Sequence, residues 1–108
     1  MKLSPRFRLP ALAATLAGAL CAQGALANEM LGRNLAATCA NCHGTNGQAR
    51  GDMKPLAGMP ADKLVAMVAD YSNGNQPATI MHQIAKGYTE DQIRLIAAFF
   101  AAQKPAAK

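Results

Sequence analysis

The clearest periodic pattern of hydrophobic residues lies near the C-terminal end of the chain. Four apolar residues share the i, i+3, i+4, i+7 spacing that places side chains on one face of an α-helix: Ile93, Ile96, Ala97 and Phe100. Thr89 and Gln92 precede this run as a capping box, which is a start signal for helices. The pattern predicts an amphipathic helix that begins after Thr89, ends near Gln103 and buries these four side chains.

Three other segments mix apolar and polar positions between residues that start or stop helices. A first helix is expected over residues 29–40. Pro60 can open a second helix, which Asn73-Gly74 would stop. Pro77 opens a shorter third helix that Gly87 ends. Because few segments resemble strands, these patterns predict an all-α fold of about four short helices.

The first 27 residues differ from the rest of the chain in composition. Three basic residues come first: Lys2, Arg6 and Arg8. The apolar run Leu9 to Ala22 follows, and its 14 residues are fewer than the roughly 20 needed to span a bilayer. Small residues at both ends of 25–27 form the cleavage pattern of a secretory signal peptide. Residues 1–27 are therefore predicted to be a signal peptide that is cleaved after Ala27.

Removal of this leader changes the charge of the chain. The leader carries three of the 11 basic residues and none of the 6 acidic ones, so the net charge falls from +5 to +2. The other basic residues are scattered, with no run that would follow a phosphate backbone, so we expect no nucleic-acid partner. Residues 28–108 should form one periplasmic domain without an integral membrane segment, with a frayed tail from about residue 104. An uncleaved anchor and a lipid attached at Cys21 remain as alternatives.

The two cysteines outside the leader belong to the run Cys39-Ala40-Asn41-Cys42-His43. A Cys-x-x-Cys-His run is typical of the attachment of a c-type haem. Two thiols about one helical turn apart can each add to one of the two vinyl groups on one haem edge. The next residue then brings its imidazole to the iron. The run predicts one covalently bound haem c, with Cys39 and Cys42 as thioethers and His43 as the proximal iron ligand.

Other interpretations explain less of this motif. A structural zinc site needs four ligands, and His82 is the one histidine left outside the motif. A thioredoxin-like redox pair would need a βαβ context, and a structural disulfide leaves the adjacent histidine without a role. A haem also suits the size of the domain, because so short a chain buries only about 60% of its surface and gains apolar volume from an enclosed cofactor.

The iron ligand on the other side of the haem is expected to be Met81. Methionine is usually a core residue, and Met67 lies among the apolar positions of the second predicted helix. Met53 and Met59 are close to the haem motif in sequence, which argues against either reaching the other face of the haem. Met81 comes later, just before the last helix. The adjacent His82 is the chemical alternative, but on a helix it would point about 100° away, toward a surface or an edge.

These features resemble a class I cytochrome c over residues 28–104. Within that family the chain is most similar to the single-haem cytochrome subunits of flavocytochrome c sulfide dehydrogenases. Four segments carry this resemblance: 35–47, 55–61, 80–89 and 93–100. It implies four helices wrapped around one haem, with the first and last helices packed together.

The resemblance also implies roles for single residues. Cys39 and Cys42 match the thioether cysteines, and His43 and Met81 match the two axial ligands. Pro55 matches a loop proline whose carbonyl accepts a hydrogen bond from the proximal imidazole. The implied function is outer-sphere transfer of single electrons, so the chain would not be an enzyme by itself. It would accept electrons from the flavin of a partner flavoprotein that oxidises sulfide.

Two other functions remain as alternatives at this point. One is a free soluble periplasmic shuttle that exchanges electrons with other redox proteins. The other is a haem enzyme or gas sensor with an open sixth position on the iron.

Overall fold

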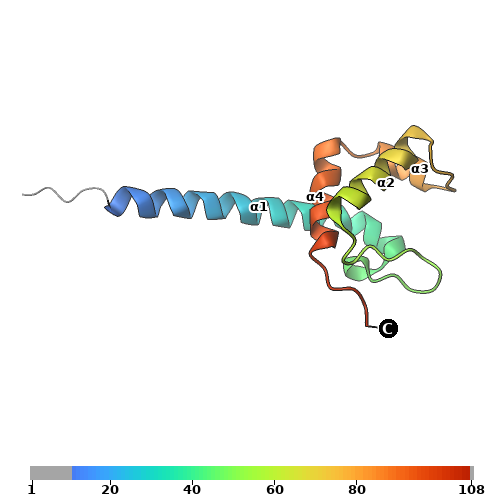
Figure 1. Ribbon diagram of the computed structural model, residues 1–108, viewed down its shortest axis with the longest axis horizontal. Coiled ribbons are helices and arrows are strands. Elements are labelled where there is room, and N and C mark those ends of the chain that lie inside the picture. Colours follow the sequence, from blue (N-terminus) through green and yellow to red (C-terminus); the bar gives the residue numbers. More distant parts are fainter. Residues whose placement is uncertain (1–10, 108) are drawn as a thin grey trace, which may run out of the picture.

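The computed structural model describes residues 11–107, with side chains described from residue 22 onward. Within this range it contains four α-helices and one short 3-10 helix, and no strand. The elements are α1 (Ala11–His43), η1 (Thr45–Gly47), α2 (Ala61–Asn73), α3 (Met81–Lys86) and α4 (Glu90–Ala101). Figure 1 shows α2, α3 and α4 gathered around the C-terminal end of α1. The predicted all-α fold is confirmed. In the part of the chain so described, no helix combines the length and the apolarity needed to cross a membrane.

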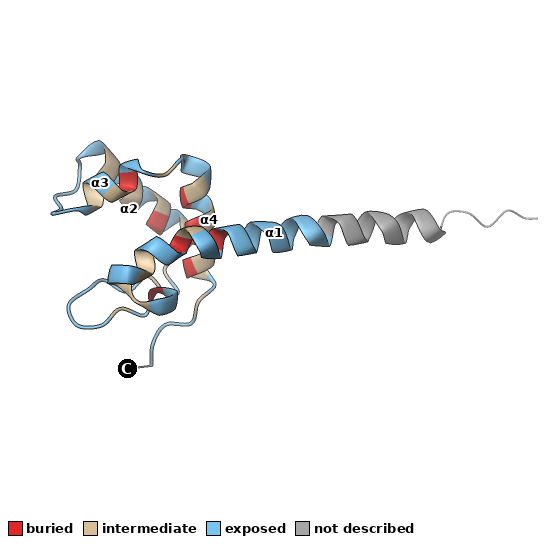
Figure 2. Cartoon of the chain, turned by 180° about the vertical axis from the view of Figure 1, so that it is seen from behind, coloured by how far each residue is buried: buried red, intermediate tan, exposed pale blue. Residues whose placement is uncertain are grey.

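The first helix is longer than the sequence pattern predicted, because α1 continues beyond residues 29–40 in both directions. Alanine and leucine dominate its N-terminal part and have high helix propensities, and no proline interrupts it. Residues 22–31 are all exposed, and this part of α1 extends away from the other helices (Figure 2). The cleavage site predicted after Ala27 lies in this exposed stretch, and cleavage stays a prediction. The basic start of the leader (residues 1–10) and the side chain of Cys21 lie outside what the structure describes.

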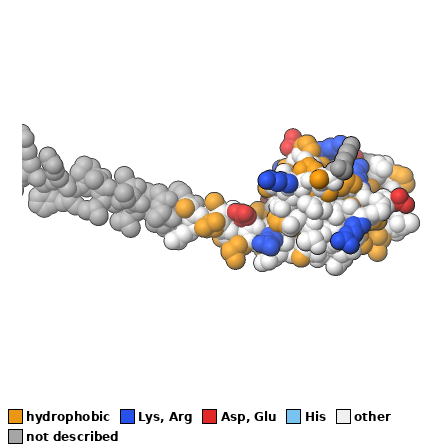
Figure 3. All heavy atoms as spheres, turned by 90° about the horizontal axis from the view of Figure 1, so that it is seen from below, with side chains coloured by type: hydrophobic (Ala, Val, Ile, Leu, Met, Phe, Trp, Pro, Cys, Tyr) orange, Lys and Arg blue, Asp and Glu red, His pale blue; other side chains and the backbone are white. Residues whose placement is uncertain are grey.

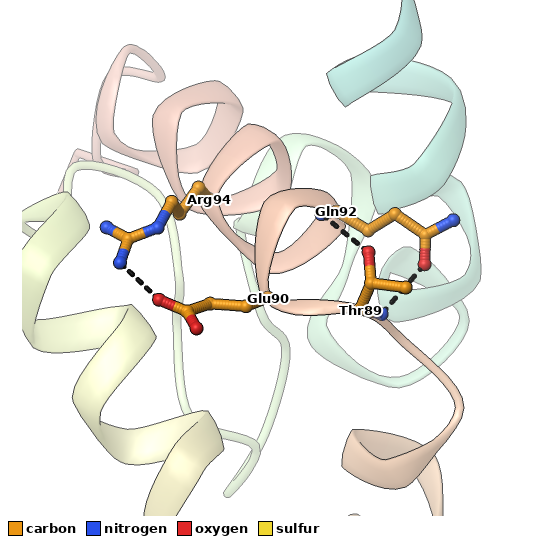
Figure 4. A network of polar contacts seen from close by, with 4 residues as sticks. All are labelled: Thr89, Glu90, Gln92 and Arg94. Atoms are coloured by element: carbon orange, nitrogen blue, oxygen red, sulfur yellow. Dashed lines mark hydrogen bonds and ion pairs between the residues drawn. The ribbon is translucent and has the colours of Figure 1, made fainter.

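The last helix, α4, has the predicted start and the predicted buried face. The Thr89 hydroxyl accepts a hydrogen bond from the Gln92 backbone N–H (3.2 Å), and the Gln92 side chain accepts one from the Thr89 N–H (2.9 Å), as Figure 4 shows. Glu90 and Arg94 add an exposed ion pair, a kind that contributes little to stability. All four residues expected on the buried face are buried, and the helix ends at Ala101, close to the predicted end.

The core forms where α4 packs against both α1 and α2. Six buried residues make up its centre: Ala36, Leu64, Ile93, Ile96, Ala97 and Phe100. The Phe100 side chain is fully buried and meets the ring of Phe99 edge-on, with the ring centres 5.2 Å apart. A Cβ atom on Gly32 would lie 2.7 Å from the Leu95 carbonyl oxygen, so the missing side chain lets the backbones of α1 and α4 approach closely. The expected packing of the first helix on the last is confirmed.

The second helix begins and ends where the sequence predicts. Pro60 precedes its first residue, and Gly74 follows its last. The Asp70 carbonyl oxygen then accepts hydrogen bonds from the backbone N–H groups of Asn75 (2.9 Å) and Gln76 (3.3 Å). These bonds turn the chain at the end of α2 before it enters α3.

The third helix starts later than predicted. It begins at Met81 and not at Pro77, whereas its expected end at Gly87 is confirmed. Ile80 has φ −135°, outside the helical region, so the segment 77–80 is not part of the helix. Isolated helices as short as α3 have little stability of their own. The helix packs against α2, and a proline permits a helix to begin without requiring it.

The segment after α4 contacts the loop between η1 and α2. The Gln48 side-chain amide donates a hydrogen bond to the Lys104 carbonyl oxygen (3.2 Å). Nearby, the Gly58 backbone N–H donates to the Phe100 carbonyl oxygen at the end of α4 (2.9 Å). Lys104, the first residue of the expected frayed tail, thus contacts the folded part of the chain.

Candidate functional site

An apolar cavity of about 340 Å³ lies among the helices. Its walls come from all four α-helices, from the loop between η1 and α2, and from the segment before α3. This volume falls within the range of about 300–1,000 Å³ that is typical of sites for small molecules and cofactors. Four of the predicted site residues line it: Cys39, Cys42, His43 and Met81. The structure therefore brings together residues that are far apart in the sequence.

The two thiols lie near the C-terminal end of α1, one turn apart. Cys39 and Cys42 are three residues apart on the helix, so both side chains are on the side that faces the cavity. Cys39 is half-buried, whereas Cys42 is exposed. Before any bond to a cofactor forms, burial raises the pKa of the Cys39 thiol. Two thiols in this arrangement can bond to two positions on one edge of a bound group.

His43 is the last residue of α1, and its ring is held by the loop that follows. The ring atom Nδ1 lies 2.7 Å from the Lys54 carbonyl oxygen. A carbonyl oxygen can only accept, so Nδ1 carries the proton in this hydrogen bond, and Nε2 keeps the lone pair that can bind a metal. The family resemblance implies the Pro55 carbonyl as the acceptor; the structure instead shows the carbonyl of the preceding residue, Lys54, in this hydrogen bond. The proline ring restricts the conformation of Lys54 and so helps to orient its carbonyl.

The loop that carries Lys54 is closed at its base by backbone hydrogen bonds. The Gly47 carbonyl oxygen accepts from the N–H groups of Leu56 (2.9 Å) and Ala57 (3.1 Å). The residues between these anchors form a surface loop in which 50–55 are all exposed. Its position therefore depends on contacts at its ends.

Met81 and His82 lie in different environments although they are neighbours in sequence. Met81 lines the apolar cavity. His82 lies in an adjoining surface groove, together with Lys86, and this groove shares Tyr71, Pro77 and Ala78 with the cavity wall. The roughly 100° between consecutive helical side chains accounts for this separation. The cavity thus contains one imidazole, from His43, and the Met81 thioether is one of several methionine side chains at its wall.

Three more methionines line the same cavity, which the sequence reasoning did not predict. Met67 was expected in the core, but it lies at the cavity wall on α2. Met53 and Met59 also reach the wall, from the loop after η1. Methionine often fills irregular apolar space. The chain has more methionines than phenylalanines or tyrosines and no tryptophan, and this is the one sequence signal that could have indicated methionines at the cavity wall. Tyr71 and Tyr88 line the cavity as well.

The residues of the cavity fit a haem c. Two thiols and an imidazole with a fixed tautomer come from one helix end. A thioether comes from α3, and the walls between them are largely apolar. This donor set suits iron in a porphyrin, because imidazole and thioether are the axial ligands of cytochromes c.

The model of the protein family described as cytochrome c matches residues 30–104 of this chain. The chain belongs to the cytochrome c family. This cytochrome is 36% identical over 72 residues to a protein described as the cytochrome subunit of sulfide dehydrogenase from Chlorobaculum tepidum. That alignment covers 67% of the chain and 66% of the subunit. It is also 36% identical over 61 residues to cytochrome c-552 of Acidithiobacillus ferridurans, which covers 56% of the chain and 26% of that protein.

A third relative is similar in size to the matched part of this cytochrome. Cytochrome c-554(548) of Halomonas halodenitrificans is 32% identical over 77 residues, and the alignment covers 68% of the chain and 93% of that protein. The family, together with Cys39 and Cys42 in the Cys-x-x-Cys-His arrangement, implies one covalently bound haem c. The chain is therefore an electron-transfer domain.

Proposed function

We propose that this cytochrome carries single electrons in the periplasm through a haem whose iron is bound by His43 and Met81. The observation that carries the proposal is the composition of the cavity wall. It combines the Cys39–Cys42 pair, the His43 ring and the Met81 thioether, whereas His82 lies in a different groove. Export through the predicted leader agrees with covalent haem attachment outside the cytoplasm.

Each of these residues has a distinct role in the proposed function. Cys39 and Cys42 would hold the haem by two thioether bonds. The haem would supply one-electron exchange at its iron. His43 and Met81 would together bind that iron, which would leave no coordination position for a substrate and would favour a higher reduction potential than two histidines. The Lys54 carbonyl keeps the His43 proton on Nδ1 and makes the imidazole a stronger donor.

We further propose that the electron donor is a flavoprotein that oxidises sulfide. Support comes from the relative described as the cytochrome subunit of sulfide dehydrogenase. The cytochrome would take electrons one at a time from the flavin of that partner, without substrate chemistry of its own. Charge gives little guidance to the docking surface, because in Figure 3 acidic and basic side chains lie singly over the visible face.

A free soluble shuttle is the second candidate function. The observation that favours it is the Halomonas relative, of which the matched segment makes up 93%. A protein of that length is little more than this one domain. Isolation of the native protein separates the two candidates: co-purification with a flavoprotein supports the subunit, and recovery as a single chain supports the shuttle.

The site itself is tested by mass spectrometry and visible spectroscopy on the chain exported by a haem-ligating host. We expect a mature chain that starts at Asn28 and carries one covalent haem. Met81→Ala should lose the thioether–iron band and bind carbon monoxide rapidly when reduced, whereas the neighbouring variant His82→Ala should keep the wild-type spectrum. A wild-type spectrum that lacks this band and changes in His82→Ala but not in Met81→Ala would assign the ligand to His82. A band that survives Met81→Ala would assign it to another methionine at the cavity wall, Met53, Met59 or Met67. Rapid carbon monoxide binding by the wild type would show an open sixth position.

A further inference from the structure

The loop that holds the proximal histidine has little packing of its own. Its residues 50–55 are all exposed, including Lys54, whose carbonyl accepts from the His43 ring. One side of the loop lines the cavity through Met53 and Lys54, and the Gly47 carbonyl closes its base, so its remaining support comes from contacts at its two ends. The contacts at the two ends of the loop therefore decide how firmly the His43 ring is oriented.

Both ends of the loop touch the residues that follow α4. At the start, the Gln48 amide donates to the Lys104 carbonyl (3.2 Å). At the end, Gly58 lies so close to Pro105 that a Cβ atom on Gly58 would be 2.7 Å from the proline Cγ. Gly58 also has φ +74°, a conformation that other residues rarely adopt, so its place in the loop is tightly specified.

The same C-terminal residues are fixed to the core helix. The Gln103 backbone N–H donates to the Phe100 carbonyl (3.1 Å), and the Gln103 side chain donates to the Phe99 carbonyl (2.8 Å). Phe100 is fully buried. A continuous set of contacts thus leads from the core, through residues 103–105, to both ends of the loop.

We propose that residues 103–105, named here the C-terminal segment, position the proximal histidine by holding the loop that carries the Lys54 carbonyl. The segment touches neither the cavity nor His43 and acts through Gln48 and Gly58. Its residues are positioning residues. This inference rests on the proposed function, in which His43 binds the haem iron.

Loosening the C-terminal segment has a defined consequence for the haem. If the Lys54 carbonyl moves away, the Nδ1 proton is shared less strongly and the imidazole becomes a weaker donor to the iron. A weaker donor stabilises the ferric state less, so the reduction potential should rise. A three- to tenfold change in the reduction equilibrium corresponds to about 30–60 mV, at about 59 mV per tenfold for one electron.

The test uses the haem-loaded chain and two changes that act on the same contact. Gln48→Ala removes the donor to Lys104, and a chain shortened after Gln103 removes Lys104 and Pro105. Gln76→Ala, an exposed glutamine in the turn after α2, is the matched control, and a chain shortened after Pro105 controls for truncation. The reduction potential and the solvent exchange rate of the His43 ring N–H, followed by nuclear magnetic resonance, are measured for each.

We expect a higher potential and faster ring N–H exchange in Gln48→Ala and in the chain shortened after Gln103, with both controls at wild-type values. Combining the two changes should add less than the sum of their separate effects, because they remove one shared contact. If the variants keep the haem and the thioether–iron band but leave both measurements unchanged, the C-terminal segment has no positioning role and the proposed function stands. A wild-type chain in which His43 does not bind the iron would overturn both.

Discussion

Gly32→Ala should destabilise the protein, although alanine favours helices more than glycine does. In a helix the exchange gains about 1 kcal/mol from propensity. Against this gain, the new Cβ would lie 2.7 Å from the Leu95 carbonyl oxygen and 3.3 Å from its carbonyl carbon. Overpacking of this kind costs about 1–3 kcal/mol. We expect the upper end, because the neighbour is backbone of α4 and cannot rotate away as a side chain can.

The net loss is then about 2 kcal/mol, which lowers the Tm of a domain of this size by about 8–16 °C. Thermal unfolding of the haem-loaded protein, followed by circular dichroism, measures it. Ala37→Gly, at an exposed position of the same helix, reports the propensity term alone and should lower the Tm by about 4–8 °C. A Tm that rises in Gly32→Ala would mean that propensity outweighs the contact, and the close approach of α1 to α4 would be refuted.

Four further predictions concern the cap, the core, the cofactor and the stability of the iron ligand. Thr89→Ala removes the capping box of α4 and should cost about 1 kcal/mol in denaturant unfolding; an unchanged midpoint would contradict it. Phe100→Ala empties a fully buried position and should lower the free energy of unfolding by about 3–5 kcal/mol in the same assay. A decrease of less than about 1 kcal/mol would contradict this prediction. The double variant Cys39→Ser, Cys42→Ser, prepared without haem, should give a far-ultraviolet spectrum with most helix lost; a cooperative native-like melt would show that the core folds alone. On heating, the thioether–iron band should fade before the helical signal, because α3 has one buried residue, Ala85, whereas coincident transitions would place Met81 in the main cooperative unit.

Local sequence signals predicted those parts of the fold that depend on neighbouring residues. The side chains of Thr89 and Gln92 each accept a hydrogen bond from the other residue's backbone N–H within one turn. The start of α4 could therefore be inferred without knowing which helices pack against it. The rotation between consecutive helical residues likewise indicated that Met81 and His82 could not both face the cavity, and Met81 is the one that lines it. The placement of Cys39 and Cys42 on one face of α1 could also be predicted, because residues three apart on a helix lie on the same side.

Features that depend on contacts between distant segments were not accessible in the same way. The hydrogen bond of His43 goes to Lys54 and not to Pro55, because a shift of one residue in a loop changes which carbonyl faces the ring. Met53 and Met59 reach the cavity because the loop folds back on itself at Gly47, and this closure has no periodic pattern in the sequence. The start of α3 was misplaced since a proline allows a helix to begin but does not require it.

The two sides of the candidate site are held by different parts of the structure. His43 is the last residue of α1, which packs along α4. The hydrogen bond of its ring goes to the Lys54 loop, and that loop contacts the residues after α4. Met81 is the first residue of α3, a helix of six residues that follows an exposed segment. The main helix contact of α3 is with α2. Both sets of residues line the same cavity. A haem bonded to both would therefore connect α3 to α1 and complete the core, so that electron transfer and stability depend on the same group.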